Sequence, residues 1–154
     1  MIKGCDRMEL KKELMQLNNT FTSKEEAIRA AGQLLVQDGA VDADYVEGMI
    51  EREGIVSTYM GNFVAIPHGT DDSKNHVNHT AISFVQVPKG IDFSDDGKEE
   101  KLAMAVFGIA GVGDDHLDLL SKIAVFCSDV ANVVRLGDAK TAEEVIDMLK
   151  EVEA

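Results

Sequence analysis

The segment KLAMAVFGIAG, residues 101–111, constrains the fold more than any other stretch because it is apolar almost throughout. A strand exposed on one face alternates apolar and polar residues, whereas a strand covered on both faces has no need to. The segment NHTAISFVQVP, residues 78–88, does alternate and predicts a half-buried strand. Helices on both faces of one small sheet would bury the central strand, so we predict a three-layer α/β sandwich.

Amphipathic helices are predicted on either side of these strands in the sequence. Residues 22–39 begin with two overlapping capping boxes, and residues 42–54 begin with an aspartate cap and end at a glycine. Residues 114–129 and 141–152 repeat the helical spacing, the latter after a further capping box. The side chains expected to face the core are Ala27, Ile28, Ala31, Leu34, Leu35, Tyr45, Val46, Met49, Ile50, Leu117, Leu120, Ile123, Ala124, Cys127, Val145, Met148, Leu149 and Val152.

The segment between the two predicted strands, PKGIDFSDDGKEEK at residues 88–101, is polar and contains glycine. This composition predicts a surface loop that connects a hairpin.

Composition limits what the chain can bind. Its 154 residues suit one domain, and a formal charge of −13 repels nucleic acid and anionic lipid while favouring protein partners with basic surfaces. No apolar run is long enough to span a bilayer, and the charged N-terminus lacks the pattern of a secretory signal. We therefore expect a cytoplasmic protein with no membrane insertion. Neither Cys5 nor Cys127 belongs to a CxxC motif.

The segment VAIPHGT, residues 64–70, places a histidine where a buried strand stops. Pro67 cannot donate a hydrogen bond to a strand neighbour, so His68 is predicted at the strand terminus. Gly69 leaves room for a partner to approach, and the hydroxyl of Thr70 could orient the ring or contact an anion. His68 is the strongest candidate for chemistry in the chain, with an unreactive loop histidine as the alternative.

Two further residues are candidates for binding an anion. His116 falls in the first turn of a helix for which Asp114 is a plausible cap, and a helix start favours a neutral imidazole and a bound anion. Arg52, near the end of a predicted helix, could be the local positive charge that a phosphate needs on an acidic protein. Both could equally be ordinary surface residues.

His76 and His79 could join Asp71 or Asp72 around a metal ion, but their spacing matches no zinc signature. Loop histidines in water are the better interpretation, and we expect neither a metal nor a cofactor. The motifs of serine hydrolases, nucleoside triphosphatases and dinucleotide-binding proteins do not occur.

Three segments carry a family resemblance: residues 26–54, residues 58–74 with VAIPHGT, and DDHLDLLSKIA at residues 114–124. They resemble the EIIA domain of the bacterial sugar phosphotransferase system, mannitol type, from about residue 10 to the end. The resemblance implies a mixed sheet flanked by helices. It also implies that His68 accepts a phosphoryl group from the phosphocarrier protein HPr and passes it to a cysteine of the EIIB component.

In this resemblance His116 and Arg52 steady the phosphoryl group, with Gly69 and Thr70 beside it. An imidazole must be unprotonated to attack, and an ordinary histidine pKa near ~6.5 makes that form abundant at neutral pH. Arginine offers forked, permanently charged donors for phosphate oxygens. The chain thus resembles a phosphotransferase component that carries a covalent phosphohistidine.

The sequence departs from the family at Asn62, where mannitol-type relatives can carry an acidic side chain. Residues 1–9 read as a polar leader, and residues 10–154 as the EIIA domain. Alternatives remain open. The chain could be a regulatory EIIA-like domain of the nitrogen-related or fructose branch that signals through binding, or a non-catalytic domain that binds a metal or ligand.

Overall fold

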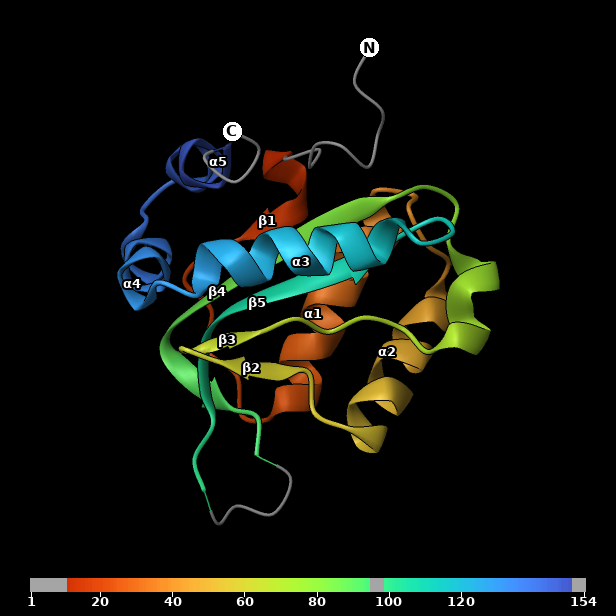
Figure 1. Cartoon of the computed structure of the whole chain (residues 1–154), viewed down its shortest axis with the longest axis horizontal. Coiled ribbons are helices and arrows are strands. Elements are labelled where there is room, and N and C mark those ends of the chain that lie inside the picture. The colour runs from red at the N-terminus through yellow and green to blue at the C-terminus, as the bar shows by residue number, and fades with distance from the viewer. Residues whose placement is uncertain (1–10, 95–98, 151–154) are drawn as a thin grey trace.

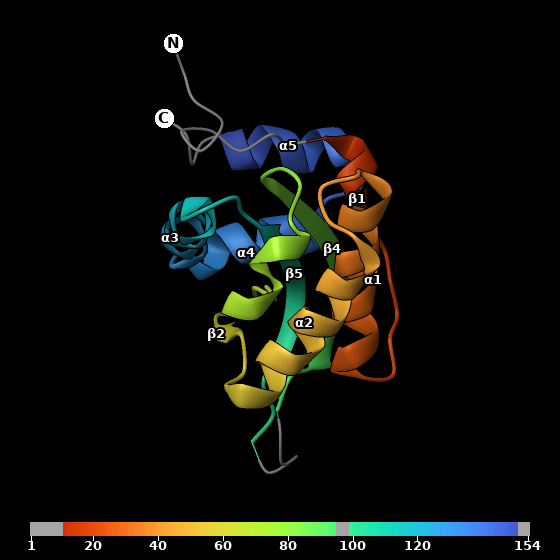
Figure 2. The same ribbon diagram turned by 90° about the vertical axis from the view of Figure 1, so that its right-hand side faces the viewer.

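The computed structural model describes residues 11–94 and 99–150, and they form three layers (Figure 1). One face of the sheet is covered by α1 (Lys24–Gln37) and α2 (Ala43–Ile55). The other face is covered by α3 (Asp115–Cys127) and α4 (Val130–Asp138), and α5 (Ala142–Lys150) packs into the same core (Figure 2). The predicted three-layer architecture is confirmed.

Within the part of the chain that the structure describes, the sheet has five strands in the order β1-β4-β5-β3-β2. Their bounds are Met15–Gln16 for β1, Tyr59–Gly61 for β2, Val64–Ala65 for β3, Ala81–Asp92 for β4 and Leu102–Ala110 for β5. The central β5 runs antiparallel to β4 and parallel to β3, so the sheet is mixed, as expected.

Strand β5 is apolar throughout because its successive side chains enter opposite cores. Val106 packs in the core beneath α1 and α2, whereas Phe107 packs in the core beneath α3 and α4. Phe107 lies directly opposite Phe84 of β4, with ring centroids 5.1 Å apart. The central strand therefore joins the two cores, and its end is a fixed point from which side chains can be positioned.

Predicted caps form at three helix starts, and of the two overlapping boxes predicted for α1 only the one at Ser23 supplies the cap. The side chains of Ser23, Asp42 and Thr141 accept hydrogen bonds from the amides of Glu26, Asp44 and Glu144 at 3.3, 3.0 and 3.1 Å. Each bond satisfies an amide that has no partner within its helix.

Several predictions of local structure were wrong. Leu117 is 56% exposed on α3, where Leu119 is buried in its place. The first residues of the predicted loop at 88–101 continue β4 to Asp92, and Gly54 lies inside the last turn of α2. Elements that were not predicted include β1, α4 and two 3-10 helices, η2 (Lys12–Leu14) and η3 (Asp71–His76).

The predicted leader and Val152 lie outside the described residues. Within the described residues, no helix has the length and apolar composition needed to cross a membrane.

Candidate functional site

His68 lies just beyond β3, where the chain leaves the sheet. Its backbone forms an isolated parallel bridge with Ile109 of β5, and the amide of Ile109 donates to the carbonyl of Pro67 at 3.0 Å. Proline can accept this bond although it cannot donate one, so pairing continues for one residue and stops. The prediction that His68 lies at a strand terminus is confirmed, and its side chain is half-buried.

The His68 ring is held by a backbone carbonyl two residues earlier in the chain. Nδ1 lies 2.9 Å from the carbonyl oxygen of Ile66. A carbonyl oxygen can only accept a hydrogen bond, so Nδ1 carries the proton and donates it. In the neutral ring Nε2 is then the nitrogen with the free lone pair. The backbone thus selects one tautomer and leaves the free lone pair on Nε2.

His116 lies in the first turn of α3, as predicted, and its ring centroid is 6.4 Å from that of His68. The turn before α3 approaches it closely, because a Cβ atom on Gly111 would be 2.2 Å from the His116 amide nitrogen. Asp114 is the residue before the helix, but its side chain makes no capping hydrogen bond. Thr80 fixes the turn instead, because its hydroxyl donates to Asp115 and accepts from the amide of Val112.

Arg52 lies in the last turn of α2, and its Nη1 donates to the carbonyl of Val56 just beyond the helix. Its positive charge acts on His68. Burial is the main cause that lowers the pKa of His68 below its ordinary value, and electrostatic interactions with Arg52 and His116 act in the same direction. The hydrogen bond to Ile66 and the charge of Glu53 oppose them.

The carboxylate of Glu53 is a part of this region that the sequence analysis missed. Glu53 is only 3% exposed and accepts from the amide and hydroxyl of Thr58 at 2.8 and 2.6 Å, and from Lys24 Nζ at 3.1 Å. These bonds fix the end of α2, where Arg52 lies. The sequence did contain a signal, because Glu53 follows Met49 by four residues on the buried face of the helix.

A cavity of about 10 Å³ lies beside the two histidines, too small to enclose a sugar. It is lined by Tyr45, His68, Gly69, Thr70, Asp71, Lys74, Val77, Gly111 and His116. Thr70 is therefore near His68, as predicted, and Lys74 is a cation that the sequence analysis did not single out. A larger cavity of about 360 Å³ lies between α2 and η3, but Asp44, Glu47, Glu51 and Asp72 line it. Those carboxylates would repel a phosphoryl group.

Position 69 has no room for a side chain, because Gly69 packs against neighbouring residues of the protein. Its amide donates to the Tyr45 hydroxyl at 3.0 Å, and a Cβ atom there would be 2.2 Å from Ser73 Oγ and 2.6 Å from Tyr45 Cε1. From the sequence, we expected this glycine to leave room for a partner that approaches from outside. The structure adds a second reason, which is contact with α2.

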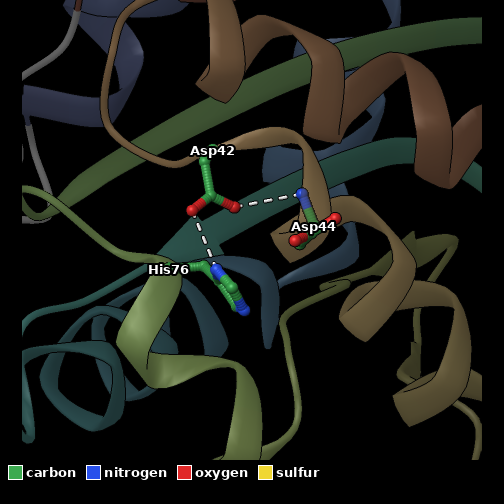
Figure 3. A group of neighbouring side chains, drawn as sticks. All are labelled: Asp42, Asp44 and His76. Atoms are coloured by element: carbon green, nitrogen blue, oxygen red, sulfur yellow. Dashed lines mark hydrogen bonds and ion pairs between the residues drawn. The ribbon is translucent and has the colours of Figure 1, made fainter.

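His76 and His79 each pair with a carboxylate other than Asp71 and Asp72, the two considered with them as metal ligands. Figure 3 shows Asp42 between its two partners: one oxygen lies 2.8 Å from His76 Nδ1, and the other caps the amide of Asp44. His79 Nε2 lies 2.8 Å from Asp38. Asp42, Asp44 and His76 are close enough to share a metal ion. Helix capping and the histidine bond already account for both oxygens of Asp42.

Asn62 has a structural role in this chain. Its Nδ2 donates to the carbonyls of Cys127 and Ser128 at 3.0 and 3.2 Å, at the end of α3. A carboxylate could not donate these bonds. Cys127 is buried, and burial raises the pKa of its thiol to about 12, so it is a core residue and not a nucleophile.

Comparison with known proteins defines the class. The sequence model for the EIIA 2 family of the phosphoenolpyruvate-dependent sugar phosphotransferase system matches residues 8–152. That match covers nearly the whole chain, so the protein belongs to this family.

Individual members of the family are similar to this chain in sequence and in structure. The chain is 51% identical over 143 residues to a protein of Geobacillus stearothermophilus named mannitol-specific phosphotransferase enzyme IIA component, covering 93% of this chain and 96% of the relative. It is similar in fold to the mannitol enzyme IIA of Escherichia coli, solved in complex with phosphorylated mannitol enzyme IIB. That match has a TM-score of 0.88 and 32% identity, and covers 94% of this chain and 99% of the other. The nitrogen regulatory IIA protein of Neisseria meningitidis matches with a TM-score of 0.76 and 28% identity, covering 90% of this chain and 94% of the other.

Replacing Gly69 tests the packing of the His68 loop. Gly69→Ala should lower the free energy of unfolding by about 1–3 kcal/mol, because the added methyl group overlaps Ser73 and Tyr45. Gly54→Ala is the matched control, since a Cβ atom there meets nothing within 4 Å and alanine favours a helix by about 0.5–1 kcal/mol. Urea unfolding measures both. Equal stability of the two variants would contradict the close packing.

The acidity of His68 can be followed by NMR titration of its ring. Its pKa should lie below the ordinary value of 6.5, mainly because the ring is buried. In the unfolded chain the His68 ring binds a proton near pH 6.5, whereas in the folded protein it binds one only at a lower pH. The free energy of unfolding therefore falls as the pH drops below 6.5. His68→Ala should lack this component. A His68 pKa at or above 6.5 would contradict the account.

Proposed function

We propose that this protein is a phosphohistidine carrier of the sugar phosphotransferase system. Nε2 of His68 accepts a phosphoryl group from phospho-HPr and passes it to a cysteine of the EIIB component, for the uptake and phosphorylation of mannitol. The observation that carries the proposal is the His68 ring. Its Nδ1 is occupied by the Ile66 carbonyl, which leaves Nε2 unprotonated beside Arg52 and His116.

Each transfer exchanges one bond to phosphorus for another. The lone pair of Nε2 forms the new nitrogen–phosphorus bond while the donor nitrogen leaves with its bonding electrons, and the EIIB thiolate later displaces Nε2 in the same way. Three phosphoryl oxygens carry the negative charge during transfer. Arg52 and His116 stabilise that charge, with Thr70 as a further donor, and Gly69 keeps the loop close to α2.

The surface beside the site is suited to docking by a partner protein that delivers a phosphoryl group. Ile55 and Val56 are 67% and 62% exposed next to Arg52, and Val112 and Leu117 are 49% and 56% exposed next to His116. Exposed apolar groups of this kind favour docking with another protein. The cavity is too small to enclose a sugar, and in this proposal HPr and EIIB dock in turn on the apolar rim and bring their reacting groups to His68.

The support for mannitol as the sugar and EIIB as the partner comes from the relatives of this chain. The Geobacillus relative is named mannitol-specific, and the Escherichia coli protein forms a complex with phosphorylated mannitol enzyme IIB. The regulatory alternative has weaker support, since identity to the nitrogen regulatory protein is 28%, against 51% for the mannitol relative. Onward transfer to an EIIB cysteine separates the carrier from the regulator.

The test is to incubate the protein with phosphoenolpyruvate, the general phosphotransferase enzyme and HPr, and then to locate the phosphoryl group by mass spectrometry. His68→Ala should fold normally and accept no phosphoryl group, whereas His76→Ala should accept it at the wild-type rate. Adding mannitol EIIB should then remove the group from the wild-type protein. Phosphorylation of His68→Ala at the wild-type rate would disprove the assignment, and a stable phosphoprotein in the presence of EIIB would favour the regulator.

Arg52→Ala and His116→Ala should still be phosphorylated on His68, but more slowly. Each variant loses a preorganised donor to the phosphoryl oxygens, and such a loss costs about 10² to 10³ in rate. Rapid-quench measurement of phosphoryl acceptance at saturating HPr gives the rate. A loss below about threefold in both variants would leave these residues as surface groups.

A further inference from the structure

Tyr45 of α2 lies at a junction of three elements of the site. Its side chain is 4% exposed, and its hydroxyl donates to the carbonyl of Ile109 at 2.7 Å. The same hydroxyl accepts from the amide of Gly69 at 3.0 Å. One oxygen atom therefore joins helix α2, the end of β5 and the loop that carries His68.

These bonds hold the backbone on both sides of His68. The carbonyl of Pro67, immediately before it, accepts from the Ile109 amide, and the amide of Gly69, immediately after it, donates to Tyr45. Ile109 is common to both connections because its carbonyl accepts from Tyr45. With its flanking peptide groups fixed in this way, His68 can keep its ring bonded to the Ile66 carbonyl.

The other two candidate groups depend on the same elements. Arg52 follows Tyr45 by seven residues on α2, which is two helical turns and hence the same face. Gly111 follows Ile109 by two residues and packs against the amide of His116. The Tyr45 hydroxyl thus connects the helix of Arg52, the loop of His68 and the strand that leads to His116.

We propose that Tyr45 is a positioning residue for phosphoryl transfer, whose hydroxyl sets how His68, Arg52 and His116 lie relative to one another. The inference rests on the function proposed above. Tyr45 itself carries no charge and stays a neutral donor, because burial raises its pKa. It acts through the backbone of Gly69 and Ile109 and does not touch the phosphoryl group.

Tyr45→Phe tests the inference because the ring remains and only the hydroxyl is lost. The change removes the bonds from the hydroxyl to the Ile109 carbonyl and from the Gly69 amide to the hydroxyl. The rate of phosphoryl acceptance at saturating HPr should fall by about ten- to hundredfold, since small misplacements of reacting groups cost rates of that order. The KM for HPr should change less than about twofold, because the docking surface is unaltered. Tyr59→Phe is the matched control, since its hydroxyl bonds to no described residue, and it should keep both constants.

A second measurement needs no phosphoryl donor and so separates this inference from the proposed function. Long-range ¹H–¹⁵N spectra should show His68 of the wild type in one tautomer, with Nδ1 protonated, and His68 of Tyr45→Phe as a mixture. A wild type that accepts no phosphoryl group would overturn the proposed function alone. A variant with the wild-type tautomer, or with the wild-type rate, would overturn the positioning role.

The wild-type protein provides a check that does not depend on folding of the variant. The amide hydrogen of Gly69 should exchange with solvent at least about tenfold more slowly than that of an exposed loop residue, because it is bonded to a buried hydroxyl. Unprotected exchange at Gly69 would overturn the inference.

Discussion

The contact between Pro67 and Ile109 is the interaction on which the site depends. Strand β3 has only two residues, yet the bond from the Ile109 amide carries its alignment with β5 past the proline. Because β5 is buried on both faces, Ile109 cannot shift without disturbing both cores. The backbone at His68 is therefore held in place by the central strand, although His68 itself lies in a loop. The same strand leads through Gly111 to His116.

The proposed function requires an acidic protein to receive a phosphoryl group. The net charge of −13 opposes any anion at long range, and in the proposed function the positive charge of Arg52 and the ring of His116 offset this locally around His68. Burial keeps His68 neutral at a lower pH than an ordinary histidine, which preserves its lone pair. The larger cavity between α2 and η3 shares Thr70 with the cavity beside His68, and its carboxylates would repel a phosphoryl group.

Sequence reasoning succeeded where the signal was local. The capping boxes, the uninterrupted apolar strand and the Pro67–Gly69 sequence each act over a few residues, so the helices, the central strand and the exit of His68 could be predicted. It failed where the role of a side chain depends on partners that are far away in the sequence. Tyr45 was predicted correctly as a core residue, but its hydroxyl partners are 24 and 64 residues away in the sequence. Leu117 was placed inward because helical periodicity cannot tell which of several adjacent leucines faces the core.

The central claim is that the Ile66 carbonyl selects Nε2 of His68 as the atom that carries the phosphoryl group. The most direct test is ³¹P and ¹⁵N NMR of the phosphorylated protein, with the histidine rings labelled. The account predicts one phosphorus signal coupled to Nε2 of His68, with Nδ1 still protonated and bonded to Ile66. Phosphorus on Nδ1 of His68, or on any other histidine, would contradict it.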